Sequence, residues 1–107
     1  MIIPDHVRTR AVEMRRTLFW EFHYEDVGKF SLEQWEHFGI ESLEHVAGVL
    51  DYQSAVPVDE WHQAATNMAA IHLLMVDTCS RAYEHLTGER PQWAMSVGVD
   101  WFLPSNN

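Results

Sequence analysis

The sequence predicts an all-α fold, an antiparallel three-helix bundle with an extended aromatic C-terminal tail. Apolar residues recur every three or four positions over residues 5–24, 32–53 and 58–87, and helix-start and helix-stop residues separate these stretches. Residues 89–107 have Pro91, Gly98 and Pro104 and a partly alternating pattern instead. A chain of 107 residues, 47% hydrophobic and 21% charged, is expected to form a single helical domain over residues 1–107.

The first predicted helix covers residues 5–24. Asp5, which follows Pro4, is the expected N-cap. Glu21 continues the apolar side of the helix, so we expect it to point inward at one end of the bundle. The apolar positions follow the spacing of one helix face: Val7, Ala11, Met14, Leu18 and Phe22.

The second predicted helix, residues 32–53, begins after Ser31, which forms a capping-box pattern with Gln34. Gly39 falls on its inner face, where a neighbouring helix can approach closely. The other inner positions are Leu32, Trp35, Leu43, Val46 and Leu50. The outward side carries Glu33, His37, Glu41, Glu44 and Asp51.

The third predicted helix, residues 58–87, is introduced by Pro57 and Asp59 and ends before Gly88. His72 lies within its predicted inner stripe. We interpret this residue as a hydrogen-bonded core histidine, with a catalytic base as the alternative. The stripe consists of Trp61, Ala64, Met68, Ile71, Met75, Cys79, Ala82 and Leu86.

The up-down-up topology predicts two clusters of polar and aromatic residues at opposite ends of the bundle. In one cluster, Glu21, Glu36 and His85 line a polar pocket or form a network at its rim. The whole first cluster comprises Trp20, Glu21, His23, Trp35, Glu36, His37, Arg81 and His85. The second comprises His6, Asp51, Asp59, Trp61 and His62.

Charge and cysteine content narrow the class of protein. The formal net charge is −9, and all of the excess lies in residues 31–107. This balance argues against direct nucleic-acid binding, which needs clustered lysine and arginine. The apolar run 68–76 is far shorter than the ~20 residues of a membrane span. The single Cys79 forms no intramolecular disulfide, and no signal-peptide pattern opens the chain, so we expect a cytoplasmic protein.

Seven histidines and a carboxylate pair raise the possibility of a metal site. Glu41-x-x-Glu44 resembles one half of the magnesium-binding motif of all-α nucleotide pyrophosphohydrolases of the MazG and dUTPase type. The resemblance implies divalent-metal chemistry on Glu41, Glu44 and Asp77. The second half of the motif is missing, because Leu74 stands three residues before Asp77. His72, Glu21 and His85 are the candidate catalytic residues of such an enzyme.

The composition favours a small acidic interaction or regulatory protein, such as an inhibitor or immunity-type protein, over an enzyme. We expect it to bind a basic protein partner and to form homo-oligomers, without a cofactor. The alternative is the metal-dependent helical enzyme or a metal-binding bundle. The tail aromatics either contact a partner or cap the bundle. The candidate interaction residues are Glu33, His37, Glu41, Glu44, Trp93, Trp101 and Phe102.

Overall fold

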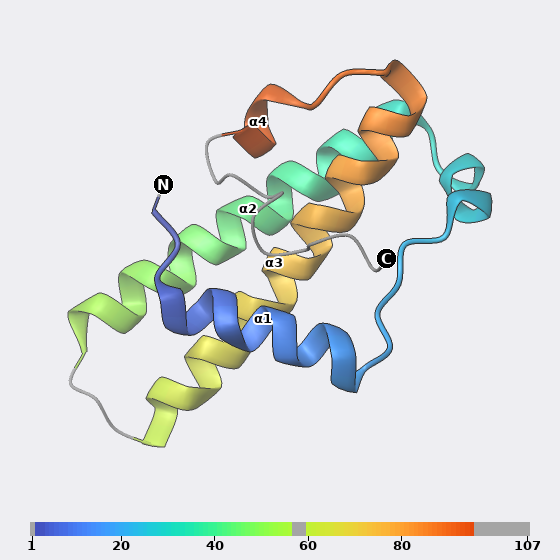
Figure 1. The fold of residues 1–107 in the computed structure, drawn as a ribbon. Coiled ribbons are helices and arrows are strands. Elements are labelled where there is room, and N and C mark those ends of the chain that lie inside the picture. Colours follow the sequence, from blue (N-terminus) through green and yellow to red (C-terminus); the bar gives the residue numbers. More distant parts are fainter. Residues whose placement is uncertain (1, 57–59, 96–107) are drawn as a thin grey trace.

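A computed structural model describes residues 2–56 and 60–95 of the chain, and the described residues are all-helical without a strand. The predicted all-α class is therefore confirmed. The main helices are α1 (Asp5–Thr17), α2 (Leu32–Ala55) and α3 (Glu60–Thr87). A 3-10 helix, η1 (Tyr24–Lys29), lies between α1 and α2, and a single helical turn, α4 (Gln92–Met95), follows α3 (Figure 1).

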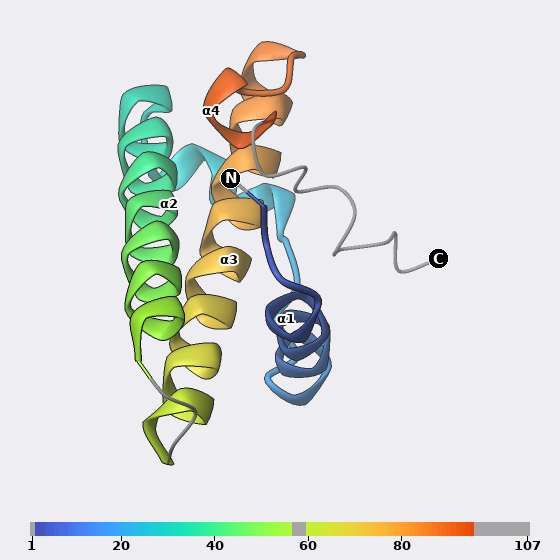
Figure 2. The same cartoon turned by 90° about the vertical axis from the view of Figure 1, so that its left-hand side faces the viewer.

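The helices α2 and α3 form an antiparallel pair, and α1 packs against α3. Figure 2 shows α2 and α3 lengthwise but α1 almost end-on, so α1 crosses the pair instead of running beside it. The sequence predicted that all three helices pack side by side. In the structure α2 and α3 do so, whereas α1 crosses them. Two hydrogen bonds hold α1 and the segment after it on α3: Arg10 Nε donates to Asn67 Oδ1 at 2.8 Å, and Trp20 Nε1 donates to Thr78 Oγ1 at 2.9 Å.

The core lies where these three helices meet. Ala69 and Ala70 of α3 are fully buried, and their small side chains let the neighbouring helices come close. Burying a leucine or valine contributes about 1.5–3 kcal/mol, so this cluster is the main source of stability. Its large side chains are Ile3, Val7, Val46, Leu73, Leu74 and Val76. A second cluster contains Val27, Trp35, Cys79 and Ala82.

The start of α2 and the end of α3 follow the sequence signals. Ser31 Oγ accepts from Gln34 N at 3.1 Å, and Gln34 Oε1 accepts from Ser31 N at 2.8 Å, which completes the predicted capping box. Gly88, with φ of +79°, follows the last residue of α3. Glycine adopts this left-handed conformation without steric cost, so it stops the helix as predicted.

The first helix ends at Thr17, seven residues before the predicted end. Phe19 adopts a left-handed φ of +51°, its N–H donates to Arg16 O, and the N–H of Trp20 donates to Arg15 O. These bonds form a Schellman motif with phenylalanine at the usual glycine position. Glu21 consequently lies outside a helix and is exposed, so the prediction that it points inward is wrong. Asp5 is the first helical residue, and Pro4 occupies the N-cap.

The predicted inner stripe of α3 is wrong for most of its length. Trp61, Ala64, Met68, Met75 and Leu86 are exposed, and only Cys79 and Ala82 of that stripe are buried. The residues beside the stripe are buried instead, because α1 and α2 pack on the alanine-containing sides of the helix. Between residues 68 and 76 the helix is apolar almost all round, so spacing alone does not identify the covered side.

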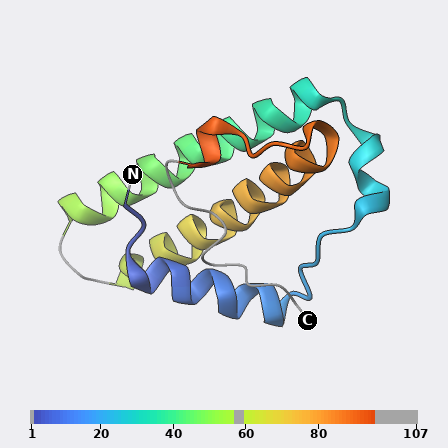
Figure 3. The ribbon, with the colours of Figure 1, turned by 45° about the horizontal axis from the view of Figure 1, so that its top comes forward.

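The C-terminal segment begins with the short helix α4, where the sequence predicted an extended chain. This turn contacts both α2 and α3 (Figure 3). Trp93 packs directly on Gly39, so that a Cβ atom added at Gly39 would stand 2.7 Å from Trp93 Cζ2. The close approach predicted at Gly39 is therefore made by Trp93, which is half-buried and belongs to the fold. Trp101 and Phe102 lie outside the described residues, as does Asp59.

Candidate functional site

The outward side of α2 forms an acidic face, defined by Glu33, His37, Glu41, Glu44 and Asp51. All five residues are exposed, as predicted from their spacing. The helix contains no lysine or arginine. Side chains three or four positions apart on a helix lie about 5–6 Å from each other. Among the four carboxylates of the face, Glu41 and Glu44 stand at this spacing, which is below the Debye length of ~8 Å at physiological ionic strength, so their fields add up.

Two histidines of α2, His37 and His45, contact Glu41 of the acidic face. Glu41 Oε2 lies 3.1 Å from His37 Nε2, and Glu41 Oε1 lies 3.9 Å from His45 Nε2. These three side chains are more than half exposed, so solvent weakens the contacts.

His72 lies at the border between α2 and α3 and stacks on His45. The ring centroids are 4.7 Å apart and the planes are inclined by 15°. Burial, and then the nearby charge of His45, lower the pKa of His72. Its Nδ1 atom is buried and has no hydrogen-bond partner within the described residues. His72 was predicted to be a hydrogen-bonded core residue. It is instead half-buried and stacked on His45.

A cavity of about 420 Å³ lies where α1, α2 and α3 converge near the start of the chain. Buried Gln53 organises its polar side: Oε1 accepts from His6 Nε2 at 3.0 Å, and Nε2 donates to Thr66 Oγ1 at 2.7 Å and to His62 O at 3.0 Å. The His6 and His62 rings stack with centroids 5.9 Å apart. His6, Asp51 and His62, predicted at one end of the bundle, therefore do line one cavity.

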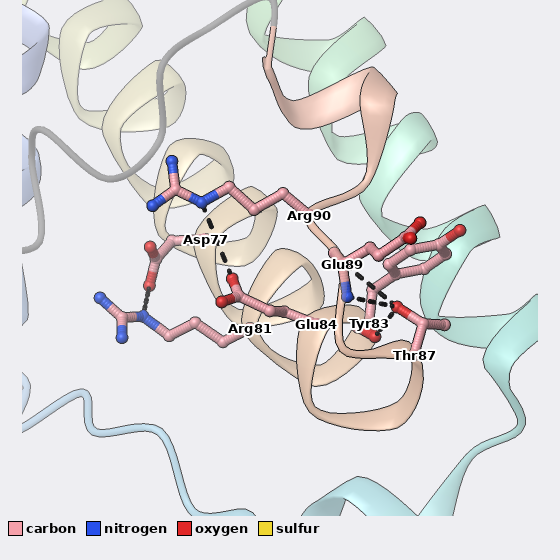
Figure 4. Close-up of polar contacts among 7 residues, drawn as sticks. All are labelled: Asp77, Arg81, Tyr83, Glu84, Thr87, Glu89 and Arg90. Atoms are coloured by element: carbon pink, nitrogen blue, oxygen red, sulfur yellow. Dashed lines mark hydrogen bonds and ion pairs between the residues drawn. The ribbon is translucent and has the colours of Figure 1, made fainter.

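The opposite end has a smaller cavity of about 350 Å³, lined by Tyr24, Arg81, Glu84 and His85. Arg81 and His85 were predicted there, whereas Glu21 and Glu36 do not line it. Arg81 Nε donates to the buried carboxylate of Asp77 at 2.8 Å (Figure 4). Arg81 thus neutralises a carboxylate that would otherwise be buried without a counter-charge.

The side chains proposed as metal ligands do not converge. Glu41 and Glu44 are exposed on α2, whereas Asp77 is buried in α3 and paired with Arg81. In residues 2–56 and 60–95, no three histidine, cysteine or acidic side chains gather closely enough to hold a metal ion. Burial raises the pKa of the Cys79 thiol to about 12, so this cysteine is a core residue and not a nucleophile.

The Gln53 network at the cavity was not predicted from the sequence. Gln53 follows Val46 and Leu50 at helical spacing, so a polar residue on the apolar stripe was its only signal.

Comparison of the chain with models of protein families, with curated proteins and with solved structures found no match. None of the helices in the described part of the chain combines the length and the apolarity needed to cross a bilayer.

Proposed function

We propose that this chain is a small regulatory interaction protein that binds a basic protein partner through the acidic face of α2. The observation that carries the proposal is the concentration of exposed carboxylates on a helix without lysine or arginine. Glu41 and Glu44 stand three positions apart, and such a like-charge pair destabilises a helix by about 0.2–0.5 kcal/mol. An exposed acidic face is suited to steering and holding a positively charged surface.

This binding mode explains how the chain acts as an inhibitor or an immunity-type protein. An acidic helix that covers the basic site of another protein prevents anions from binding there. It needs no catalytic activity to do so. The reduced, buried Cys79 is compatible with our expectation of a cytoplasmic location. We further propose that the protein self-associates, and the exposed apolar residues of α3 support this second part.

The test of the acidic face uses two variants with equal net charge. Glu33→Gln/Glu41→Gln/Glu44→Gln removes three carboxylates from the acidic face. The matched control, Glu13→Gln/Glu25→Gln/Glu89→Gln, removes three exposed carboxylates elsewhere.

Binding to poly-L-lysine and capture of basic proteins from a lysate are both measured at 50 and 300 mM salt. We expect the face variant to lose at least tenfold in affinity at low salt and the control variant to lose much less. Equal losses in the two variants would show that net charge alone, and not the α2 face, determines binding.

A further inference from the structure

An apolar stripe runs along the first half of α3 on its solvent side. It is made of Trp61, Ala64, Met68 and Met75, spaced by three, four and seven residues. Trp61 is 62% exposed, Met68 54% and Met75 36%. An exposed row of large apolar side chains on a helix of a small protein is typical of a contact surface.

Neighbouring helices occupy other sides of α3. Thr66 receives the hydrogen bond from Gln53 of α2, and Asn67 receives that from Arg10 of α1. Figures 1 and 2 show α1 and α2 against different sides of α3, and within residues 2–56 and 60–95 no other helix lies over its first half. The large side chains of the stripe accordingly stay exposed beside the core that the described helices form.

The stripe is also the least charged part of the molecule. Residues 61–76 contain no aspartate, glutamate, lysine or arginine, although the chain as a whole carries −9. A basic partner finds no carboxylate to pair with there and is directed to the acidic face of α2. A second copy of the chain, in contrast, brings a stripe that is equally uncharged, so two like-charged molecules can meet at this surface without direct repulsion.

The spacing of the stripe matches twofold symmetry. Trp61 and Met75 both lie seven residues, or about two helical turns, from Met68. When two α3 helices cross antiparallel at Met68, Trp61 of one copy meets Met75 of the other, and Met68 meets Met68. Ala64 then lies opposite His72, whose ring stacks on His45 of α2, and the small side chain of Ala64 lets the two helices come close there. Such self-complementarity is what an isologous dimer interface requires.

We propose that a second copy of this chain covers the stripe, with the two α3 helices antiparallel about Met68. The inference specifies the surface and the symmetry of the self-association proposed above and rests on it. The tryptophan–methionine contacts at the two ends are of a kind that is favourable in protein cores. The dimer leaves the acidic face of α2 to another partner.

The test compares Met68 with Met95, which is 62% exposed but lies on α4, away from the stripe. Sedimentation equilibrium of the full chain gives the dimer dissociation constant for the wild type, Met68→Glu and Met95→Glu. We expect a wild-type dimer at 10–100 μM. Met68→Glu places two like charges at the twofold axis, so it should raise the constant more than tenfold, whereas Met95→Glu should leave it nearly unchanged.

Cysteine variants test the symmetry and do not depend on a charge that disturbs folding. Met68→Cys should form a disulfide-linked dimer under mild oxidation, and Met95→Cys should not. A monomeric wild type at several hundred μM would overturn both the interface and the proposed self-association. A dimer that tolerates Met68→Glu, or that Met68→Cys does not cross-link, would overturn this interface alone. Neither result affects the acidic face, whose variants are tested separately.

Discussion

Replacing Gly39 by alanine tests how the C-terminal turn is held on α2. A methyl group at this position meets the ring of Trp93 at a distance that real Cβ contacts do not show. The bulky ring of Trp93 contacts Gly39 and makes an edge-on contact with Tyr83, with the ring centroids 6.5 Å apart. The substitution therefore forces the ring, and α4 with it, to move away from α2.

The stability change caused by Gly39→Ala follows from two opposing effects. Alanine in a helix interior is better than glycine by up to about 1 kcal/mol. Overfilling a packed site costs typically about 1–3 kcal/mol. Gly48, in the interior of the same helix, has open space around its added Cβ, so Gly48→Ala shows the helix-propensity gain alone. We expect Gly39→Ala to be about 1–3 kcal/mol less stable than Gly48→Ala.

Urea unfolding, followed by circular dichroism at one fixed protein concentration, measures this difference. A double-mutant cycle with Trp93→Ala identifies its origin. Without the ring there is no clash, so Gly39→Ala should stabilise that background about as much as Gly48→Ala does. If Gly39→Ala stabilises the wild type as much as Gly48→Ala, the seating of Trp93 on Gly39 is refuted.

Three further predictions concern α1, the cavity network and the stacked histidines. Phe19→Gly should stabilise the protein by up to about 1 kcal/mol, because Phe19 is 85% exposed and held at positive φ; Phe19→Ala, which keeps the strained backbone, should give no gain in thermal unfolding. Gln53→Leu should cost about 2 kcal/mol in urea unfolding, because His6 Nε2, Thr66 Oγ1 and His62 O each lose a hydrogen bond to Gln53, and a near-neutral result would contradict the network. The lowered pKa of His72 means that the folded protein binds its proton less readily than the unfolded chain. Its contribution to stability is complete above pH 6.5 and decreases as the pH falls from 6.5 toward the lowered folded-state pKa, so His72→Gln should flatten the loss of stability between pH 7.5 and 5.5.

Local signals in the sequence predicted the helix ends that depend on residues close together in the chain. The capping box at Ser31 and Gln34, and the glycine stop at Gly88, need no information from elsewhere in the fold. The end of α1 was not predictable in this way. A bulky residue at positive φ is rare, so Phe19 gave no stop signal and the apolar spacing continued past it.

The packing of the helices determines which residues are buried where the local sequence pattern does not. Because α3 is apolar around most of its circumference, the position of α1 and α2 determines which side is buried. The sequence therefore identified Met68 and Met75 as apolar stripe residues but placed them inside. Gln53 was missed as a site residue for a related reason, because its hydrogen bonds join α2 to residues of α1 and α3.

The contact between Trp93 and Gly39 has a kinetic consequence. The α2–α3 hairpin is formed by helices adjacent in the chain, so much of the structure folds through local contacts. Trp93 and Gly39 are separated by the whole of that hairpin, and their contact gains nothing until both helices are in place. We expect it to form after the folding transition state, where a contact slows unfolding without speeding folding. The packing of the Trp93 ring on Gly39 then lengthens the lifetime of the folded chain and protects the C-terminal turn from proteolysis.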